Sequence, residues 1–260
     1  MLNKDRNIKK FQKKEEGLYF SRFEIKFVID ENISKILQKK IDKFMEIDPF
    51  AKNFENQKYF VRSLYFDNDK FHNFNQKIDG LKIRHKFRLR TYSNIKDDSS
   101  IVFIEKKGRF NERTYKIRKK INISDLENFT LDDDKIALAK KYQNEKIINE
   151  FIFDFYKQKL KPKVLVDYYR KPYVNKYGVY FRLTFDSNLS SMGNKNNLFP
   201  TYNDTKLTIP GYEILEVKFD RTIPPWFQKI IQSFELKRLS VSKFVLGCET
   251  SNLAYDFEGR

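Results

Sequence analysis

Eight segments of this chain alternate between apolar and polar residues, and each is rich in Phe, Tyr, Val or Ile. A period of two is typical of β-strands that bury one face and expose the other. The segments span residues 19–29, 58–67, 81–92, 101–107, 113–121, 163–171, 178–186 and 212–220, with glycines or polar loops between them. Eight strands are enough to close a barrel.

Three further segments have the apolar spacing of amphipathic helices. They lie at about 32–45, 134–159 and 224–237, and the last begins at Pro224-Pro225, because proline is favoured in the first turn of a helix. The sequence shows no internal repeat and no low-complexity linker, so we expect one domain over residues 18–260. Residues 1–17 hold many basic and few apolar residues, which predicts a basic, mobile arm.

The composition excludes several classes of protein. With 26 Phe and 15 Tyr in 260 residues, the chain can bury a sizeable core and is not a disordered protein. One cysteine, Cys248, excludes a disulfide scaffold and a cysteine-based zinc site, and two histidines are too few for a His-rich metal centre. The sequence has no apolar run of about 18 residues, so we expect a soluble, cytoplasmic protein without a membrane span. The formal charge of +17 indicates an anionic partner.

The polar faces of the predicted strands carry rows of cations. In segment 81–92 basic residues occupy every second position, namely Arg84, Lys86, Arg88 and Arg90. The other segments add Arg22, Lys26, Lys107, Lys116, Arg118, Arg170, Arg182 and Lys218. An ordinary solvated face mixes charges of both signs, because like charges on neighbouring strands repel. Such rows are favourable where they converge on an anion.

Two geometries would bring these rows onto an anion. An open basic sheet could bind nucleic acid, with aromatic residues on the same face to stack the bases. Alternatively, the sheet could close with its polar faces inward. Most strand phenylalanines alternate with the cations and so lie on the opposite face. We therefore predict an α+β fold, a closed antiparallel eight-stranded β tunnel barrel with a charged interior and peripheral helices, and we expect no nucleic acid partner.

Four acidic residues share the faces of the cations, namely Glu24, Glu105, Asp186 and Glu216. Carboxylates of this kind have no use in a site that only binds phosphate. In phosphoryl transfer they can hold Mg²⁺ or Mn²⁺ while cations clamp the phosphate oxygens. The alternative for each is a structural ion pair, and for Glu105 the two interpretations are equally supported. Glu216 is the first candidate ligand.

The order of motifs resembles the polyphosphate polymerase domain of the vacuolar transporter chaperone (VTC) family, within the triphosphate tunnel metalloenzymes. The matching strings are Arg22-Phe-Glu24-Ile-Lys26-Phe, Ser63-Leu-Tyr65-Phe-Asp67, Arg84-x-Lys86-x-Arg88-x-Arg90-x-Tyr92, Ile104-Glu105-Lys106-Lys107, Tyr168-Tyr169-Arg170, Arg182-Leu-Thr184-Phe-Asp186, Leu215-Glu216-Val217-Lys218 and Ser242-Lys243. The match spans about residues 20–245. The resemblance implies synthesis of inorganic polyphosphate from ATP with a divalent metal, Mn²⁺ or Mg²⁺.

The resemblance also implies roles for individual residues. The catalytic cations are Lys26, Arg88, Arg90, Lys107, Arg170 and Arg182. The substrate-binding residues are Arg22, Arg84, Lys86, Lys116, Arg118, Lys218, Ser242 and Lys243, and the metal ligands are Glu216 and Glu24. Hydrolytic members often have Glu where this chain has Arg22, which favours the polymerase branch and weakens the case for Glu24. Ser240 stands where the polymerase pattern has a basic residue, and Lys237 or Arg238 could replace it.

Two other functions stay open from the sequence. A triphosphatase or polyphosphatase of the same fold would use water as the acceptor in place of polyphosphate. A non-catalytic module that binds polyanions or RNA would show steep salt dependence and no need for a metal.

Overall fold

The computed structural model describes residues 23–111, 113–131, 135–193, 197–201 and 204–256. The predicted arm and Arg22 lie outside these residues. One antiparallel sheet contains all the strands in order β1-β10-β8-β7-β3-β4-β5-β6. Its strands are β1 (Phe23–Asp30), β3 (Tyr59–Asp67), β4 (Ile83–Thr91), β5 (Val102–Phe110), β6 (Arg113–Ile121), β7 (Lys161–Asn175), β8 (Phe181–Gly193) and β10 (Tyr212–Phe219). The eight predicted strands are confirmed, and the α+β class with them.

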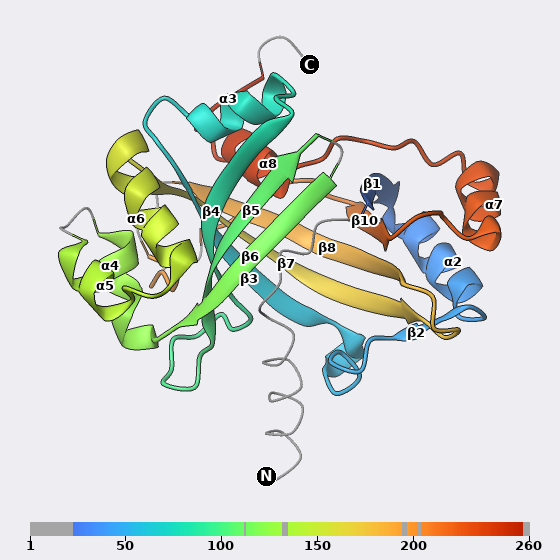
Figure 1. Cartoon of the computed structure of the whole chain (residues 1–260). Coiled ribbons are helices and arrows are strands. Elements are labelled where there is room, and N and C mark those ends of the chain that lie inside the picture. Colours follow the sequence, from blue (N-terminus) through green and yellow to red (C-terminus); the bar gives the residue numbers. More distant parts are fainter. Residues whose placement is uncertain (1–22, 112, 132–134, 194–196, 202–203, 257–260) are drawn as a thin grey trace.

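Closure of the barrel by hydrogen bonds is not confirmed. The ladder of paired strands ends at β1 on one side and β6 on the other, and no pairing joins the two within the described residues. The sheet is nevertheless strongly curved, and Figure 1 shows β4, β5 and β6 crossing in front of β3, β7 and β8. Lys107 of β5, the strand paired with β6, lies 3.2 Å from Glu24 of β1, so an ion pair links β1 to this side of the sheet. The curvature leaves the polar faces inside.

Two short strands were not predicted. β2 (Met45–Ile47) pairs with the end of β7, and β9 (Lys206–Leu207) pairs with β8. Both are too short to produce a periodic pattern, so the sequence carries no signal for them.

The predicted helices are present with changed bounds. Asp30 caps the N-terminus of α2 (Glu31–Ile41), because its side chain accepts a hydrogen bond from the Asn32 amide. α7 (Pro225–Ser233) has proline in its first turn. The predicted helix at 134–159 is wrong as one element, since it divides into α5 (Ile136–Lys141) and α6 (Lys146–Gln158). The break contains Asn144, a residue type with low helix propensity. Three short helices were missed, α3 (His72–Ile78), α4 (Leu126–Thr130) and α8 (Lys243–Thr250).

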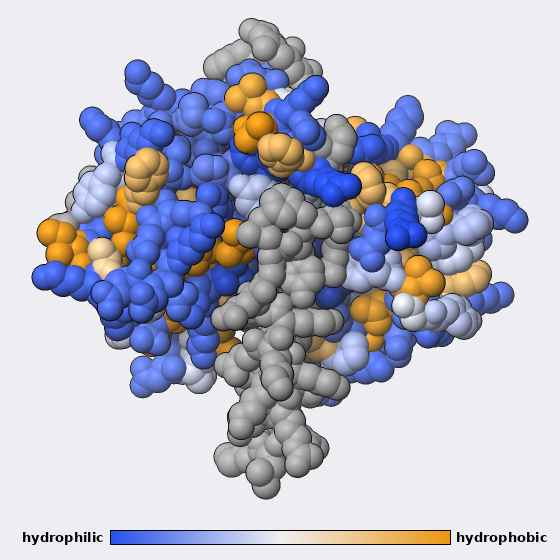
Figure 2. All heavy atoms as spheres, in the orientation of Figure 1, coloured by the Kyte–Doolittle hydropathy of each residue, from blue (hydrophilic) through white to orange (hydrophobic). Residues whose placement is uncertain are grey.

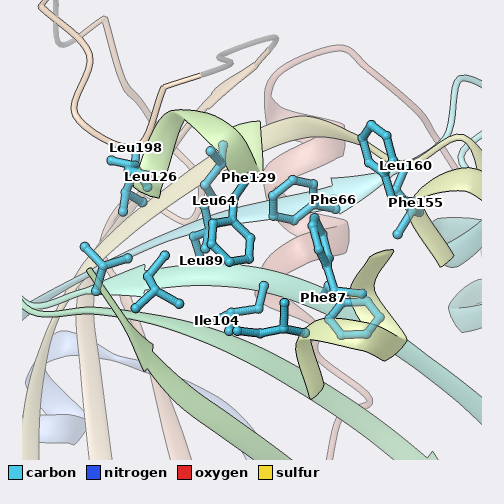
Figure 3. Close-up of a cluster of buried hydrophobic side chains, with 14 of the residues drawn as sticks. Leu64, Phe66, Phe87, Leu89, Ile104, Leu126, Phe129, Phe155, Leu160 and Leu198 are labelled. Carbon is cyan, nitrogen blue, oxygen red and sulfur yellow. The ribbon is translucent and has the colours of Figure 1, made fainter. Parts of the chain in front are cut away.

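Two hydrophobic clusters cover the outer face of the sheet. Under α4, α5 and α6, the apolar face of β3 to β5 packs against the helices, as Figure 3 shows for Leu64, Phe87, Ile104 and Phe129. Under α2 and α7, the outer residues of β1, β8 and β10 form the second cluster. This packing explains why most strand phenylalanines alternate with the cations.

A third cluster contains α8, a helix that was not predicted and that is not peripheral. Phe244 of α8 packs with Tyr65, Val166 and Ile214, which belong to the inward face of the sheet. Gly247 allows the close approach, because a Cβ there would lie 2.8 Å from the Val166 side chain. α8 therefore fills part of the interior at one end of the curved sheet.

The molecular surface is mostly polar. Figure 2 shows hydrophilic residues over most of one face, with apolar residues in separate patches. Within the described part of the chain, no helix has the length and apolar character needed to cross a membrane.

Candidate functional site

One cavity of about 2250 Å³ lies on the inward face of the sheet. It is lined by every predicted site residue that the structure describes. From β1, β4 and β5 come Glu24, Lys26, Arg84, Lys86, Arg88, Arg90 and Lys107. From β6, β7, β8, β10 and the start of α8 come Lys116, Arg118, Arg170, Arg182, Glu216, Lys218, Ser242 and Lys243. The predicted alternation of faces is thereby confirmed, while the roles of these residues stay predictions.

Glu216 and Asp186 form one buried carboxylate pair that shares two cations. Arg170 donates to Asp186 at 2.6 Å and to Glu216 at 3.0 Å. The Lys243 ammonium lies 2.6 Å from Asp186 and 2.9 Å from Glu216. Asp186 is fully buried and Glu216 nearly so. Burial alone would raise the pKa of Glu216, but the surrounding lysines and Arg170 lower it well below its usual value.

Glu105 organises a second group of cations. Arg88 donates to Glu105 Oε2 from Nε at 2.8 Å and from a terminal nitrogen at 2.6 Å, and Lys116 lies 3.6 Å from Oε1. Arg90 lies 3.8 Å from Glu105 and donates to Ser63 at 3.0 Å. Glu105 does not line the cavity and is fully buried. The structure therefore supports the interpretation of Glu105 as the structural partner of Arg88.

Glu24 occupies the place where the two ends of the sheet approach. Its carboxylate lies 3.3 Å from Lys26 and 3.2 Å from Lys107. Lys26 also lies 3.5 Å from Glu216, so one ammonium group connects the two predicted metal ligands. Glu24 and Glu216 thus border the same part of the cavity.

Two lysines have pKa values close to neutral pH. Burial lowers the pKa of Lys218 to about 8, against the opposing effect of Glu216 and Glu24. For Lys116, Glu105 favours the charged form, but burial and three neighbouring arginines outweigh it and lower the pKa to about 7. An anion bound beside these groups would favour their protonation.

The arginines at the far end of the cavity contact a loop and an aromatic cluster. Arg182 lies 2.7 Å from Asp48 in the loop before β3. Arg118 stacks over Phe103 at 4.6 Å. Next to them Tyr59 contacts Phe50 at 5.0 Å and Tyr92 at 5.8 Å between ring centroids. Phe50 and Phe54 each expose 41% of their surface at this mouth.

Lys86 differs from Lys26, Arg88 and Arg170, because no carboxylate of the described residues lies within 4 Å of its ammonium group. Its ammonium donates to Ser242 Oγ at 3.3 Å and lies 4.8 Å from the centre of the Phe244 ring. Burial lowers the pKa of Lys86 well below its usual value, and the like charges of Lys107, Lys26, Arg88 and Arg84 lower it further. Burial and the neighbouring cations therefore oppose the charge of Lys86.

We expect Lys86→Met to stabilise the fold while weakening anion binding. The depressed pKa means that the charged lysine costs folding free energy below its folded pKa, a cost that disappears as the pH rises toward the unfolded value of about 10.4. Thermal unfolding at pH 7 should show a melting temperature raised by about 2–4 °C per kcal/mol gained. Lys82→Met, at an exposed position on the same hairpin, is the control and should change little. A lower melting temperature for Lys86→Met would contradict the expectation.

The sequence missed several groups that the structure places at the site. The Tyr65 hydroxyl oxygen accepts a hydrogen bond from Arg88 at 2.9 Å, and the Tyr168 hydroxyl oxygen accepts one from Arg90 at 3.2 Å, so both hydroxyls help to hold the arginines. Lys77 of α3 reaches Ser240 at 2.9 Å. The parity of Tyr65 could have placed it on the inward face, whereas Asp48 and Lys77 lie outside the predicted strands and gave no signal.

Comparisons with known proteins give one family and several similar folds. Among solved structures, a protein from Hippeastrum described with a dominant triphosphatase activity has a TM-score of 0.48 and 11% identity, over 88% of this chain and 95% of that chain. A candidate adenylate cyclase from Bacillus halodurans has a TM-score of 0.46 and 15% identity, over 85% and 94%. No curated protein matches the sequence. The family model of the VTC domain matches residues 21–252.

Proposed function

Because the chain belongs to the VTC domain family, we propose that it is an ATP-dependent polyphosphate polymerase. The reaction would transfer the γ-phosphoryl group of ATP to the end of a polyphosphate chain. One observation carries the proposal: fifteen predicted site residues line one cavity, from segments between β1 and α8. A phosphate chain is the anion that a cavity of this size with so many cations fits best.

The reaction requires no nucleophile from the protein. A terminal oxygen of the polyphosphate would attack the γ-phosphorus, the bond from that phosphorus to the bridging oxygen of ADP would break, and ADP would leave with the electron pair. The task of the protein is then to position two anions that repel each other and to stabilise the charge on the transferred group. Arg88, Arg90 and Arg170 are held by Glu105, Ser63 and Asp186 in directions that suit this task.

The residues fit a divalent metal that arrives with the nucleotide. Mg²⁺ and Mn²⁺ accept one or two carboxylates, with phosphate oxygens and water completing the shell. Glu216 would hold it, with Glu24 nearby, and the buried hydroxyl of Thr184 has no partner among the described residues. Thr184 is paired with Glu216 across the β10–β8 ladder. No cluster of three or more Asp, Glu, His or Cys side chains exists in the described part, so a metal held by protein ligands alone does not fit. When bound, the metal would neutralise charge on the phosphates.

The aromatic mouth supports a nucleotide as the donor. Phe50 and Phe54 are exposed and contact each other, and Phe50 also contacts Tyr92, the residue directly after β4. Nucleobases stack on exposed aromatic rings. We therefore place the base at this mouth and the phosphates along the arginines.

The proposal is tested by incubating the purified protein with ATP and Mn²⁺ and analysing the phosphate products by gel electrophoresis. We expect a long polymer that an exopolyphosphatase degrades, with release of ADP. Release of free phosphate alone would contradict the proposal and favour a triphosphatase. Tight binding of polyphosphate without turnover, and without any need for metal, would favour the binding module.

A further inference from the structure

Three cations at one mouth of the cavity differ in their partners from the cations that surround Glu24, Glu105, Asp186 and Glu216. In the middle of the cavity Arg88, Lys107, Arg170 and Lys243 each lie within 4 Å of a carboxylate. At the mouth formed by α3, the start of β4 and the segment before α8, Lys77, Arg84 and Lys86 have no carboxylate within that distance in the described structure. Positive charge is compensated in the middle and left uncompensated here.

The three cations are held by neutral oxygens. Lys77 donates to Ser240 Oγ at 2.9 Å, Lys86 donates to Ser242 Oγ at 3.3 Å, and Arg84 donates to the carbonyl oxygen of Leu81. Ser240 and Ser242 are two residues apart, so the segment before α8 orients two lysines from two other elements. Such contacts position an ammonium group without neutralising it.

The mouth lies at the end of β4 opposite the aromatic cluster. Arg84 and Lys86 begin the row of cations on β4, and Arg88 and Arg90 continue it toward Tyr92. Six residues of an extended strand, from Lys86 to Tyr92, span about 20 Å. A linear anion could bind the arginines that are paired with carboxylates. If it were longer than a triphosphate, it would also contact Lys86, Arg84 and Lys77.

Mutual repulsion at this mouth is visible in the pKa values. Burial and the charges of Arg84, Lys26 and Arg109 lower the pKa of Lys77 and outweigh the opposing effect of Asp256. Burial and Arg109 lower the pKa of Arg84. A bound anion would remove this repulsion. Because no carboxylate of the described residues lies within 4 Å of the three groups, an anion needs no metal to bind there.

We infer that Lys77, Arg84 and Lys86 form a second anion subsite, which holds a polyphosphate chain beyond the phosphates in the carboxylate-paired part of the cavity. The inference rests on the proposed function for the identity of the anion. It assigns the two mouths different tasks, the aromatic mouth for the nucleotide and the α3 mouth for the chain. Lys77 was not among the predicted site residues. Its ammonium group lies beside Ser240, the position at which the family pattern has a basic residue.

The test compares binding of tripolyphosphate and of a much longer polyphosphate by isothermal titration calorimetry in the presence of EDTA. Lys77→Gln should weaken binding of the long chain about ten-fold, the effect of losing one charge-assisted contact, and should leave tripolyphosphate binding within about two-fold. The salt dependence of long-chain binding should decrease by about one unit of slope. Arg84→Gln should behave in the same way, and Lys82→Gln, exposed and outside the cavity lining, should change neither ligand.

Two results would overturn the inference. Equal weakening of both ligands would place Lys77 in the triphosphate site, and unchanged binding of the long chain would remove it from any site. Both measurements are made without turnover, so they are independent of the polymerase assay. If the protein released only free phosphate from ATP, the proposed function would fail while a selective loss of long-chain binding would still establish the subsite.

Discussion

Replacing Arg88 by methionine is expected to abolish turnover and to lower the free energy of unfolding by about 3 kcal/mol. Breaking a buried ion pair costs about 3–5 kcal/mol, because the remaining charge stays buried. Glu105 is fully buried and would lose two hydrogen bonds, yet Arg90 and Lys116 remain within 4 Å, which places the effect at the lower end. Turnover should fall at least 100-fold, since a fixed cation on the phosphates is lost. Denaturant unfolding and initial rates at a temperature where the variant is folded would measure both.

The control for Arg88 is another buried arginine on the same sheet. Arg62 donates to Asp167 at 2.9 and 2.7 Å and is 1% exposed, but neither residue lines the cavity. Arg62→Met should destabilise the protein by a similar amount and leave anion binding unchanged. If both variants lost binding equally, the effect of Arg88→Met would be one of stability alone. Arg88→Met combined with Glu105→Gln should recover stability and not activity.

Glu216→Gln is expected to reduce turnover by at least 1000-fold while anion binding is retained or becomes tighter. The substitution keeps the shape and removes the carboxylate that we propose to hold the metal. Lys243 and Arg170 keep Asp186 as a partner, and Lys26 keeps Glu24, so the fold should persist. Polyphosphate binding in EDTA and the polymerase assay with Mn²⁺ separate the two effects. Turnover close to that of the unchanged protein would remove Glu216 from the metal site.

The same variant should change the response to acid. The depressed pKa of Glu216 gives stability that is present above the unfolded value of about 4.3 and is lost as the pH falls through the lower folded pKa. Glu216→Gln lacks this contribution, so its stability should fall less between pH 5 and pH 2. Glu213→Gln is the matched control on β10, because Glu213 is buried, accepts from Ser34 at 2.5 Å and does not line the cavity. Its turnover should be unchanged.

The alternation of charged and apolar residues predicted the strands and the lining of the cavity from sequence. This succeeded because a one-residue shift would bury the arginines of β4 under α6 and expose Phe87 and Leu89, so the pattern fixes the register. The two interpretations of Glu105 could not be separated in the same way. Parity shows that a side chain faces inward, but only the fold shows that Arg88 covers it from solvent.

The features of the fold and the site that could not be predicted from sequence belong to elements too short to show a periodic pattern of apolar residues. α8 has eight residues, and its burial depends on the close approach of Gly247 to Val166 of β7 and Ser191 of β8, which are neighbours only in the folded sheet. Lys77 lies on a seven-residue helix, where a single lysine is indistinguishable from a solvated one. Closure was predicted from the number of strands, but strand number does not determine whether the first and last strands form hydrogen bonds.

The position of α8 has a consequence for the order of folding. Lys243 neutralises two carboxylates, and it follows Glu216 by 27 residues. If the strands paired before α8 docked, Glu216 and Asp186 would be enclosed with Arg170 as their main cation. The inward side chains Val166 and Ile214 would remain exposed to solvent. Docking of α8 removes both defects in one step. We therefore expect the cavity to become able to bind phosphate only when α8 has docked, which is a late step of folding.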